Sequence, residues 1–171
     1  MLNIFQRNRV IILKAPLTGE VIRLRDVPDQ AFSQKMIGDG IAIKPTNPYL
    51  VSPVKGEIIK VFPSNHALGI KTGEGLEILL HLGIDSVELK GKGFEALIKE
   101  GQRVKPGERL VKIDWDLIDG EIASTISPIV ITNMEMVGGI KLLTDGSVQS
   151  GDDLLAVTID LPRDNFNKLK D

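Results

Sequence analysis

Short apolar runs, each bounded by glycine, proline or polar residues, recur along the whole chain. They are rich in Ile, Val and Leu and have the length of single strands, and 17 glycines and 9 prolines punctuate the chain. This pattern is typical of strands joined by tight turns. It predicts strands at residues 10–13, 20–24, 41–43, 57–62, 76–80, 110–113, 129–132 and 154–159. Helical patterning predicts only short turns within residues 28–36, 94–99 and 114–119, the last capped by Asp114.

Two short internal sequence repeats suggest that the fold is built from similar halves. PLTGEVI at residues 16–22 recurs as PVKGEII at 53–59, and VKPGERL at 104–110 recurs as VQSGDDL at 148–154. In each copy a glycine suits a tight turn between strands. The chain is therefore expected to be all-β: a single-domain antiparallel β-sandwich, barrel-sandwich-like and pseudo-repeated, with a few short helical turns. We expect a flexible segment at residues 1–9, the domain at 10–161 and a polar tail at 162–171.

Composition narrows the classes of function. Of the 171 residues, 42% are apolar and only 4% aromatic, which predicts one domain with an aliphatic core. The formal charge of −2 and the scattered basic residues give no electrostatic footprint for nucleic acid. The chain has no cysteine, which excludes disulfides and thiolate metal sites and fits a reducing cytoplasm. No apolar run is long enough to form an integral membrane segment, and nothing in the sequence calls for a metal or another cofactor.

The candidate chemistry rests on the only two histidines, His66 and His81. Both stand at or beside strand-like runs, and the glycine-rich turn at residues 72–75 separates them. Two strands joined in this way would pair antiparallel and could bring the imidazoles together on one face. Because histidine changes charge near neutral pH, a close pair is a candidate for proton or phosphoryl handling. The alternative is that both histidines are structural residues with satisfied hydrogen bonds.

Eight stretches, two of which contain the histidines, carry a family resemblance. They are APLTGE at 15–20, DVPDQAF at 26–32, MIGDGIAIKP at 36–45, NHA at 65–67, HLGID at 81–85, VELKG at 87–91, EGQRV at 100–104 and ITNM at 131–134. In this order they resemble the glucose-type enzyme IIA family of the phosphoenolpyruvate-dependent sugar phosphotransferase system. The resemblance extends over roughly residues 10–160 and implies a phosphoryl carrier.

The resemblance also implies roles for individual residues. It makes His66 the phosphoryl acceptor through Nε2 and His81 a hydrogen-bond donor to the phosphoryl oxygens. Gly83 matches the position whose carbonyl takes the Nδ1–H of the acceptor, which would leave Nε2 free to attack. Ser64 stands where the family often has threonine and is expected to hold the histidine pair. The expected apolar rim of the site comprises Phe32, Met36, Ile37, Phe62, Leu79 and Val87, with Asp29 and Asp85 at its edge.

The partners implied by the resemblance are proteins. The donor would be the phosphohistidine of the small carrier HPr, and the acceptor a cysteine on a IIB domain of a sugar permease. Regulatory protein targets are a further possibility within the same family. Phosphoryl transfer of this kind depends mainly on in-line positioning and on stabilising the charge of the equatorial oxygens. An apolar rim would keep water from the labile N–P bond.

Three other classes of protein share features with this sequence. A zinc metallopeptidase of related β architecture needs three protein ligands, arranged as His-x-x-x-Asp and His-x-His. Ile70 stands where the aspartate would follow His66, and Leu79 and Gly83 stand at the two positions where a second histidine would accompany His81. A biotinyl or lipoyl carrier needs a lysine where Glu135 stands between two methionines. A family relative that only binds regulatory partners, without being phosphorylated, is less consistent with the retention of both histidines.

Overall fold

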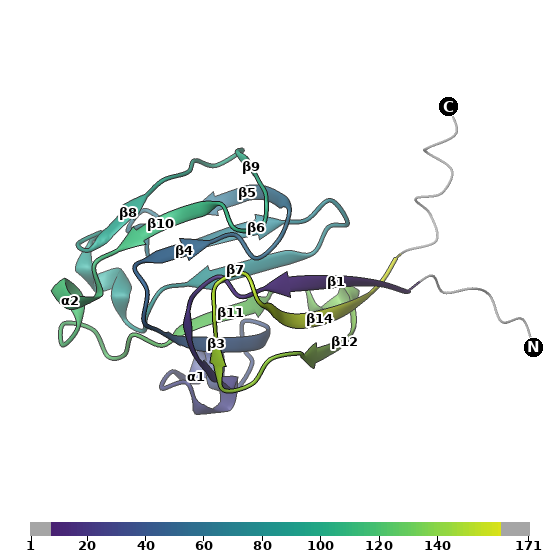
Figure 1. The fold of residues 1–171 in the computed structure, drawn as a ribbon, viewed down its shortest axis with the longest axis horizontal. Helices are drawn as coiled ribbons and strands as arrows, with labels where there is room; N and C mark the ends of the chain where they lie inside the picture. The colour runs from purple at the N-terminus through teal and green to yellow at the C-terminus, as the bar shows by residue number, and fades with distance from the viewer. Residues whose placement is uncertain (1–7, 162–171) are drawn as a thin grey trace, which may run out of the picture.

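The structure, a computed structural model, describes residues 8–161 and is rich in strands (Figure 1). The strands are β1 Asn8–Lys14, β2 Gly19–Ile22, β3 Asp39–Pro45, β4 Tyr49–Val51, β5 Gly56–Val61, β6 Ala67–Lys71, β7 Glu77–His81, β8 Phe94–Ala96, β9 Arg103–Val104, β10 Arg109–Ile113, β11 Ser127–Ile131, β12 Val137–Leu142, β13 Ser147–Val148 and β14 Asp153–Asp160. The helices are α1 Gln30–Ser33 and α2 Trp115–Ile118, with single 3₁₀ turns η1 Leu24–Asp26, η2 Ser86–Leu89 and η3 Met134–Met136.

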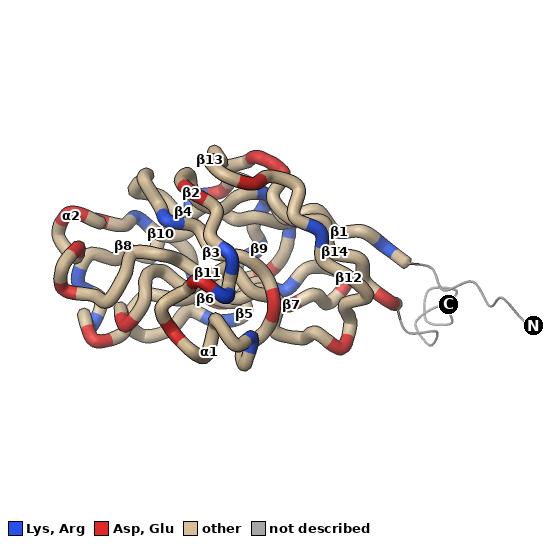
Figure 2. The backbone as a smooth tube through the Cα atoms, turned by 90° about the horizontal axis from the view of Figure 1, so that it is seen from below, with Lys and Arg blue, Asp and Glu red and all other residues tan. Residues whose placement is uncertain are grey.

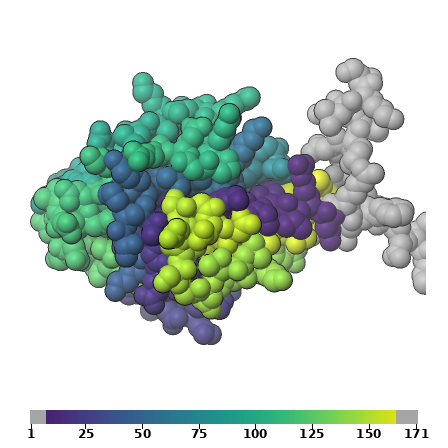
Figure 3. Space-filling view, in the orientation of Figure 1, coloured from purple at the N-terminus to yellow at the C-terminus, as the bar shows by residue number. Residues whose placement is uncertain are grey.

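Every strand pair within the described residues is antiparallel, so the predicted all-β class is confirmed. The main sheet has the order β13-β2-β3-β11-β7-β6-β5-β9, and two three-stranded sheets have the orders β1-β14-β12 and β4-β10-β8. Because β1 pairs with β14, the first strand (purple) lies beside the last (yellow) in Figure 3. The two ends of the domain thus close on each other, and the β6–β7 hairpin lies inside the main sheet.

The core is aliphatic, as the composition predicts, and it has two parts. The larger cluster includes Ile43, Ile70 and Leu80, each 1% exposed or less. A smaller cluster of Leu24, Val27, Phe32, Ala42, Ile84 and Val130 lies on the other side of β3 and β11. Both faces of these two strands are consequently buried in mid-strand, where Ile41 and Ile43 join the larger cluster and Ala42 the smaller one. The smaller cluster is the one that supports the histidine site.

The short helical stretches are partly as expected. Helix α1 lies within residues 28–36, and α2 follows Asp114, whose side chain accepts a hydrogen bond from the backbone N–H of Leu117. The helical turn predicted at 94–99 is wrong, because residues 94–96 form strand β8. Phe94 pairs with Ile113 of β10 and is only 6% exposed, so tertiary pairing overrides the local helical preference.

The ends of the predicted domain lie close to the limits of the described residues. Strand β1 already includes Asn8 and Arg9, two residues earlier than expected, while residues 1–7 and the tail at 162–171 lie outside the part that the structure describes. Figure 2 shows Lys and Arg interspersed with Asp and Glu along the backbone. Among residues 8–161, no helix is long and apolar enough to cross a membrane.

Candidate functional site

The two histidines lie side by side, as the hairpin argument predicts. Strands β6 and β7 pair antiparallel, with Ala67 opposite His81, and the N–H of Leu82 donates to the carbonyl of His66 at 2.7 Å. The imidazole centroids are 5.2 Å apart, with ring planes inclined at 80°. The main-chain pairing of one hairpin therefore sets the distance between the two rings.

A backbone carbonyl orients His81. Nδ1 of His81 lies 2.7 Å from the carbonyl oxygen of Gly83. A carbonyl can only accept, so the neutral ring carries its proton on Nδ1 and leaves the Nε2 lone pair free. Gly83 makes this turn with φ of +73°, and a Cβ there would lie 2.8 Å from Cδ1 of Ile122. The turn thus requires glycine for its backbone conformation, and an added Cβ would also displace the tip of the Ile122 side chain.

This contact corrects one expectation. Gly83 was expected to hold Nδ1 of His66, but its carbonyl contacts the ring two residues earlier in the same turn. The backbone of His66 pairs with Leu82, and its Nδ1 is buried without a hydrogen-bond partner among the described residues. The arrangement expected of the acceptor, a proton held on Nδ1 by the Gly83 carbonyl and a free Nε2, is found in the structure at His81.

Both imidazoles favour the neutral form at neutral pH. Burial, and secondarily the neighbouring His81, lower the pKa of His66 to about 4. Burial also lowers the pKa of His81, although its hydrogen bond to Gly83 and the charges of Asp29 and Asp85 act in the opposite direction. Only 6% of His66 is exposed, whereas His81 is half-buried. His81 is therefore the more accessible of two neutral rings.

Aromatic side chains frame the histidine pair. The ring of Phe32 meets His81 edge-on at 5.1 Å and 61°, and the ring of Phe62 lies 5.8 Å from His66. Phe32 is carried by the short helix α1, whose N-terminus is capped by Asp29: the carboxylate accepts from the N–H of Ala31 at 2.8 Å and of Phe32 at 3.3 Å. Asp29 thus positions one wall of the site and is more than an edge charge.

The other predicted rim residues differ in exposure. Met36 is 72% exposed, Val87 52% and Ile37 36%, while Leu79 is half-buried against the smaller core cluster. Asp85 is exposed and follows the Gly83 turn with φ of +60°. Exposed apolar side chains near a reactive site are typical of a protein-docking surface.

Ser64 does not hold the histidine pair as expected. Its hydroxyl donates to the carbonyl of Val87 at 3.4 Å, and it therefore links the loop before β6 to η2. The segment at 122–127 was not predicted to lie at the site. It packs against the Gly83 turn through Ile122, and the carbonyl of Ser124 accepts from the N–H of Ile84 at 2.8 Å. Nothing in its composition signals that it lies beside the histidines.

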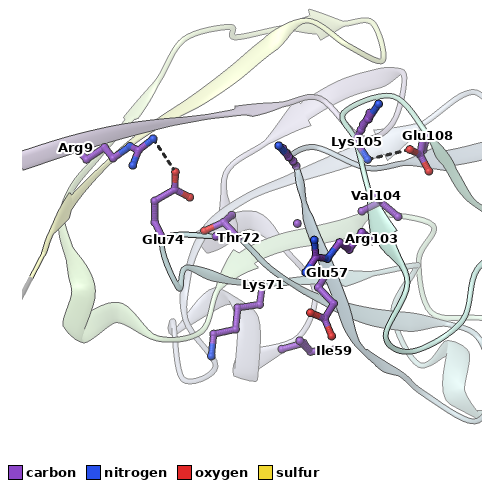
Figure 4. Close-up of a pocket in the computed structure, with 13 residues that line it drawn as sticks. Arg9, Glu57, Ile59, Lys71, Thr72, Glu74, Arg103, Val104, Lys105 and Glu108 are labelled. Carbon is purple, nitrogen blue, oxygen red and sulfur yellow. Dashed lines mark hydrogen bonds and ion pairs between the residues drawn. The ribbon is translucent and has the colours of Figure 1, made fainter. Parts of the chain in front are cut away.

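A cavity of about 690 Å³ lies elsewhere, at the opposite end of β5 and β6 (Figure 4). Basic and acidic side chains share its lining, including the ion pair between Arg9 and Glu74. It contains none of the predicted site residues. Within residues 8–161, no cluster of three or more His, Cys, Asp or Glu side chains is arranged to hold a metal ion.

Fold and site together define a β-sandwich protein with a paired-histidine centre. The family described as phosphoenolpyruvate-dependent sugar phosphotransferase system, EIIA 1, matches residues 11–137. The chain is 43% identical over 142 residues to the PTS system glucose-specific EIIA component of Staphylococcus aureus, covering 83% of this chain and 86% of the relative. The corresponding protein of Staphylococcus epidermidis is 44% identical over the same length and coverage.

A solved structure agrees with these sequences. Glucose permease IIA from Mycoplasma capricolum superposes with a TM-score of 0.83 at 37% identity, covering 86% of this chain and 96% of that one. The chain therefore belongs to the EIIA 1 family of the phosphoenolpyruvate-dependent sugar phosphotransferase system, and it is a phosphoryl carrier of that system.

Proposed function

We propose that His81 accepts the phosphoryl group on Nε2 and that His66 assists the transfer. The observation that carries this assignment is the 2.7 Å contact between Nδ1 of His81 and the carbonyl of Gly83. It keeps the proton on Nδ1, so that the Nε2 lone pair of a neutral ring is available as the nucleophile. The lowered pKa of His81 supports the neutral form before attack.

The transfer balances without a cofactor. The Nε2 lone pair of His81 forms the new N–P bond while the donor's N–P bond breaks, and the released electron pair stays on the donor imidazole. Nδ1 keeps its proton, so the phosphorylated ring bears positive charge. The carbonyl of Gly83 and the carboxylates of Asp29 and Asp85, which all favour a charged His81, stabilise that state.

His66 is placed to stabilise the moving phosphoryl group. Its pKa of about 4 keeps it neutral, and its buried Nδ1 has no partner among the described residues. Nε2 is then the nitrogen that can donate to a phosphoryl oxygen, from a ring 5.2 Å from His81. A donor held in place before reaction stabilises charge that develops in the transition state.

Family membership supports two protein partners. The donor is the phosphohistidine of HPr, and the acceptor is the cysteine of a IIB domain in a sugar permease, with both reactions in the cytoplasm. The exposed side chains of Met36, Val87 and Ile37 supply an apolar docking surface for both partners. The relatives named as glucose-specific support a glucose-type sugar as the final acceptor.

The test is to locate the phosphoryl group. The full chain is incubated with phosphoenolpyruvate, enzyme I and HPr, and the labelled residue is mapped by mass spectrometry under alkaline conditions that preserve N–P bonds. We expect one phosphoryl group per chain, on His81. The His81→Ala variant should take up none, and His66→Ala should still be labelled. Phosphate mapped to His66 in the wild type would overturn the assignment.

A further inference from the structure

Ser127 is a buried polar residue that contacts the Gly83 turn. It is the first residue of β11, is 1% exposed, and lies 44 positions from Gly83 in the sequence. Its hydroxyl accepts from the N–H of Gly83 at 3.1 Å and donates to the carbonyl of Thr125 at 2.9 Å. Both of its hydrogen-bonding directions are therefore fixed by the protein itself.

Hydrogen bonds to two consecutive backbone N–H groups anchor the turn whose carbonyl binds His81. The N–H of Gly83 is bound to Ser127 Oγ, and the next N–H, of Ile84, is bound to the carbonyl of Ser124 at 2.8 Å. Between these two anchors the Gly83 carbonyl points back to Nδ1 of His81. A glycine at φ of +73° has wide conformational freedom, so the direction of its carbonyl depends on such anchors.

We propose that Ser127 is a positioning residue for phosphoryl transfer: by binding the N–H of Gly83 it aims the carbonyl that holds the proton on Nδ1 of His81. The inference rests on the proposed function, because it matters for catalysis only if His81 is the acceptor. Of the two anchors, Ser127 is the one made by a side chain, so mutation can remove it.

Removing the hydroxyl has two separable effects. It leaves the N–H of Gly83 and the carbonyl of Thr125 without their partner. This lowers the free energy of unfolding whether or not Ser127 has a role in transfer. It also frees the Gly83 carbonyl to turn away from His81, so that the ring can carry its proton on Nε2 instead. The second effect is specific to a positioning role, since an Nε2–H tautomer cannot attack phosphorus.

The experiment compares the wild type with Ser127→Ala, with Ser127→Thr, which keeps the hydroxyl, and with Ser52→Ala. Ser52 is the matched control: it is fully buried and its hydroxyl donates to the carbonyl of Val54 at 2.7 Å, within the loop between β4 and β5. Nitrogen-15 NMR of the imidazoles reports the tautomer of His81, and quench-flow with phosphorylated HPr reports uptake. Denaturant unfolding is measured alongside.

We expect Ser127→Ala to lose the Nδ1–H signature of His81 and to take up phosphate about tenfold more slowly. This is the lower end of the effect known for residues that orient metal-binding histidines. Ser52→Ala should lose stability but keep both the tautomer and the rate, and Ser127→Thr should stay near the wild type. If Ser127→Ala does not fold, Ser127→Cys keeps the volume with a weaker acceptor and should show a partial shift.

The outcomes separate this inference from the proposed function. An unchanged His81 tautomer and an unchanged uptake rate in the alanine variant, with phosphate still on His81, would overturn the role of Ser127. Phosphate on His66 in the wild type would overturn the proposed function instead, and the NMR measurement would still report whether Ser127 orients the Gly83 turn.

Discussion

Phe32 and His81 meet edge to face, with ring centroids 5.1 Å apart. The ring of His66 lies 5.2 Å from the same imidazole, so two rings contact His81 while the Gly83 carbonyl holds its Nδ1. Rotation of His81 is thereby restricted before any partner arrives. Such preorganisation reduces the cost of reaching an in-line geometry for phosphoryl transfer.

Replacing Phe32 tests the value of this confinement. Phe32→Leu keeps an apolar side chain on α1, the helix that Asp29 caps, but removes the aromatic ring that packs against His81. We expect a loss of about 1 kcal/mol in unfolding free energy, in the range for aromatic pairs, and slower phosphate uptake. Phe62→Leu is the control, because that ring faces His66 instead. Equal uptake rates in the two variants would contradict a special role for Phe32.

His66→Gln separates uptake from onward transfer. Glutamine can still occupy the site, but it does not reproduce the imidazole donor proposed to stabilise the phosphoryl oxygens. We expect the variant to accept phosphate from HPr and to pass it to IIB roughly a hundredfold more slowly, the usual effect of losing one preorganised donor. Single-turnover transfer to IIB measures this directly, and transfer at the wild-type rate would remove His66 from the mechanism.

Gly83→Ala tests the turn itself. An alanine at φ of +73° is strained, and its Cβ would lie 2.8 Å from Ile122 and 3.1 Å from the carbonyl of Ser124. We expect a loss of about 1–2 kcal/mol in stability from the left-handed conformation alone, together with impaired phosphate uptake. Gly146→Ala is a matched control, since Gly146 has φ of +75° with nothing within 4 Å of the added Cβ. It should lose similar stability and keep full uptake.

Stability should depend on pH through His66. Its pKa falls from 6.5 in the unfolded chain to about 4 in the folded one, so between these values the unfolded chain binds more protons. The contribution of neutral His66 to stability is therefore fully present above about pH 6.5, and it is lost as the pH falls toward about 4. We expect chemical denaturation of His66→Gln to show a shallower loss over this window than the wild type. Parallel curves would show that the folded protein does not depress this pKa.

The sequence was sufficient for the fold class and for bringing the histidines together, and the reasons are local. Glycine-punctuated apolar runs define strands, and two strands joined by the short turn between His66 and His81 pair antiparallel. The direction of the Gly83 carbonyl could not be foreseen, because it depends on a positive φ and on contacts from Ser124 and Ser127, about 40 residues away in the sequence. The resemblance placed the acceptor at His66, and our proposal assigns that role to His81 because of the direction of this carbonyl.

The same limit explains the helix wrongly predicted at 94–99. The local sequence FEALIK favours a helical turn, but Phe94 is buried against Ile113 when β8 pairs with β10. Likewise, the hydroxyl of Ser64 was expected at the histidines and instead binds Val87, whose position depends on the 3₁₀ turn η2. Tertiary packing decides which side chains from distant segments contact each other, and local sequence patterns do not reveal these contacts.

The last prediction concerns how HPr reaches the site. Asp85 is exposed beside the Gly83 turn. Burial lowers the pKa of His81, and the charge of Asp85 is among the effects that oppose this lowering. A carboxylate at this edge should steer a donor that carries basic side chains around its phosphohistidine. Asp85→Asn should preserve the backbone, because asparagine tolerates the left-handed conformation that Asp85 adopts at φ of +60°.

We expect the second-order rate constant for phosphate uptake by Asp85→Asn to fall about threefold at low ionic strength, the order for one exposed charge worth about 1 kcal/mol or less. The loss should shrink as salt screens the field over a shorter distance. Glu95→Gln is the charge-matched control, because Glu95 is exposed on β8 in a different sheet from the histidines, and its uptake should stay unchanged. A salt-independent loss in Asp85→Asn would instead indicate that the carboxylate acts on His81 itself, by favouring the charged ring that forms on phosphorylation.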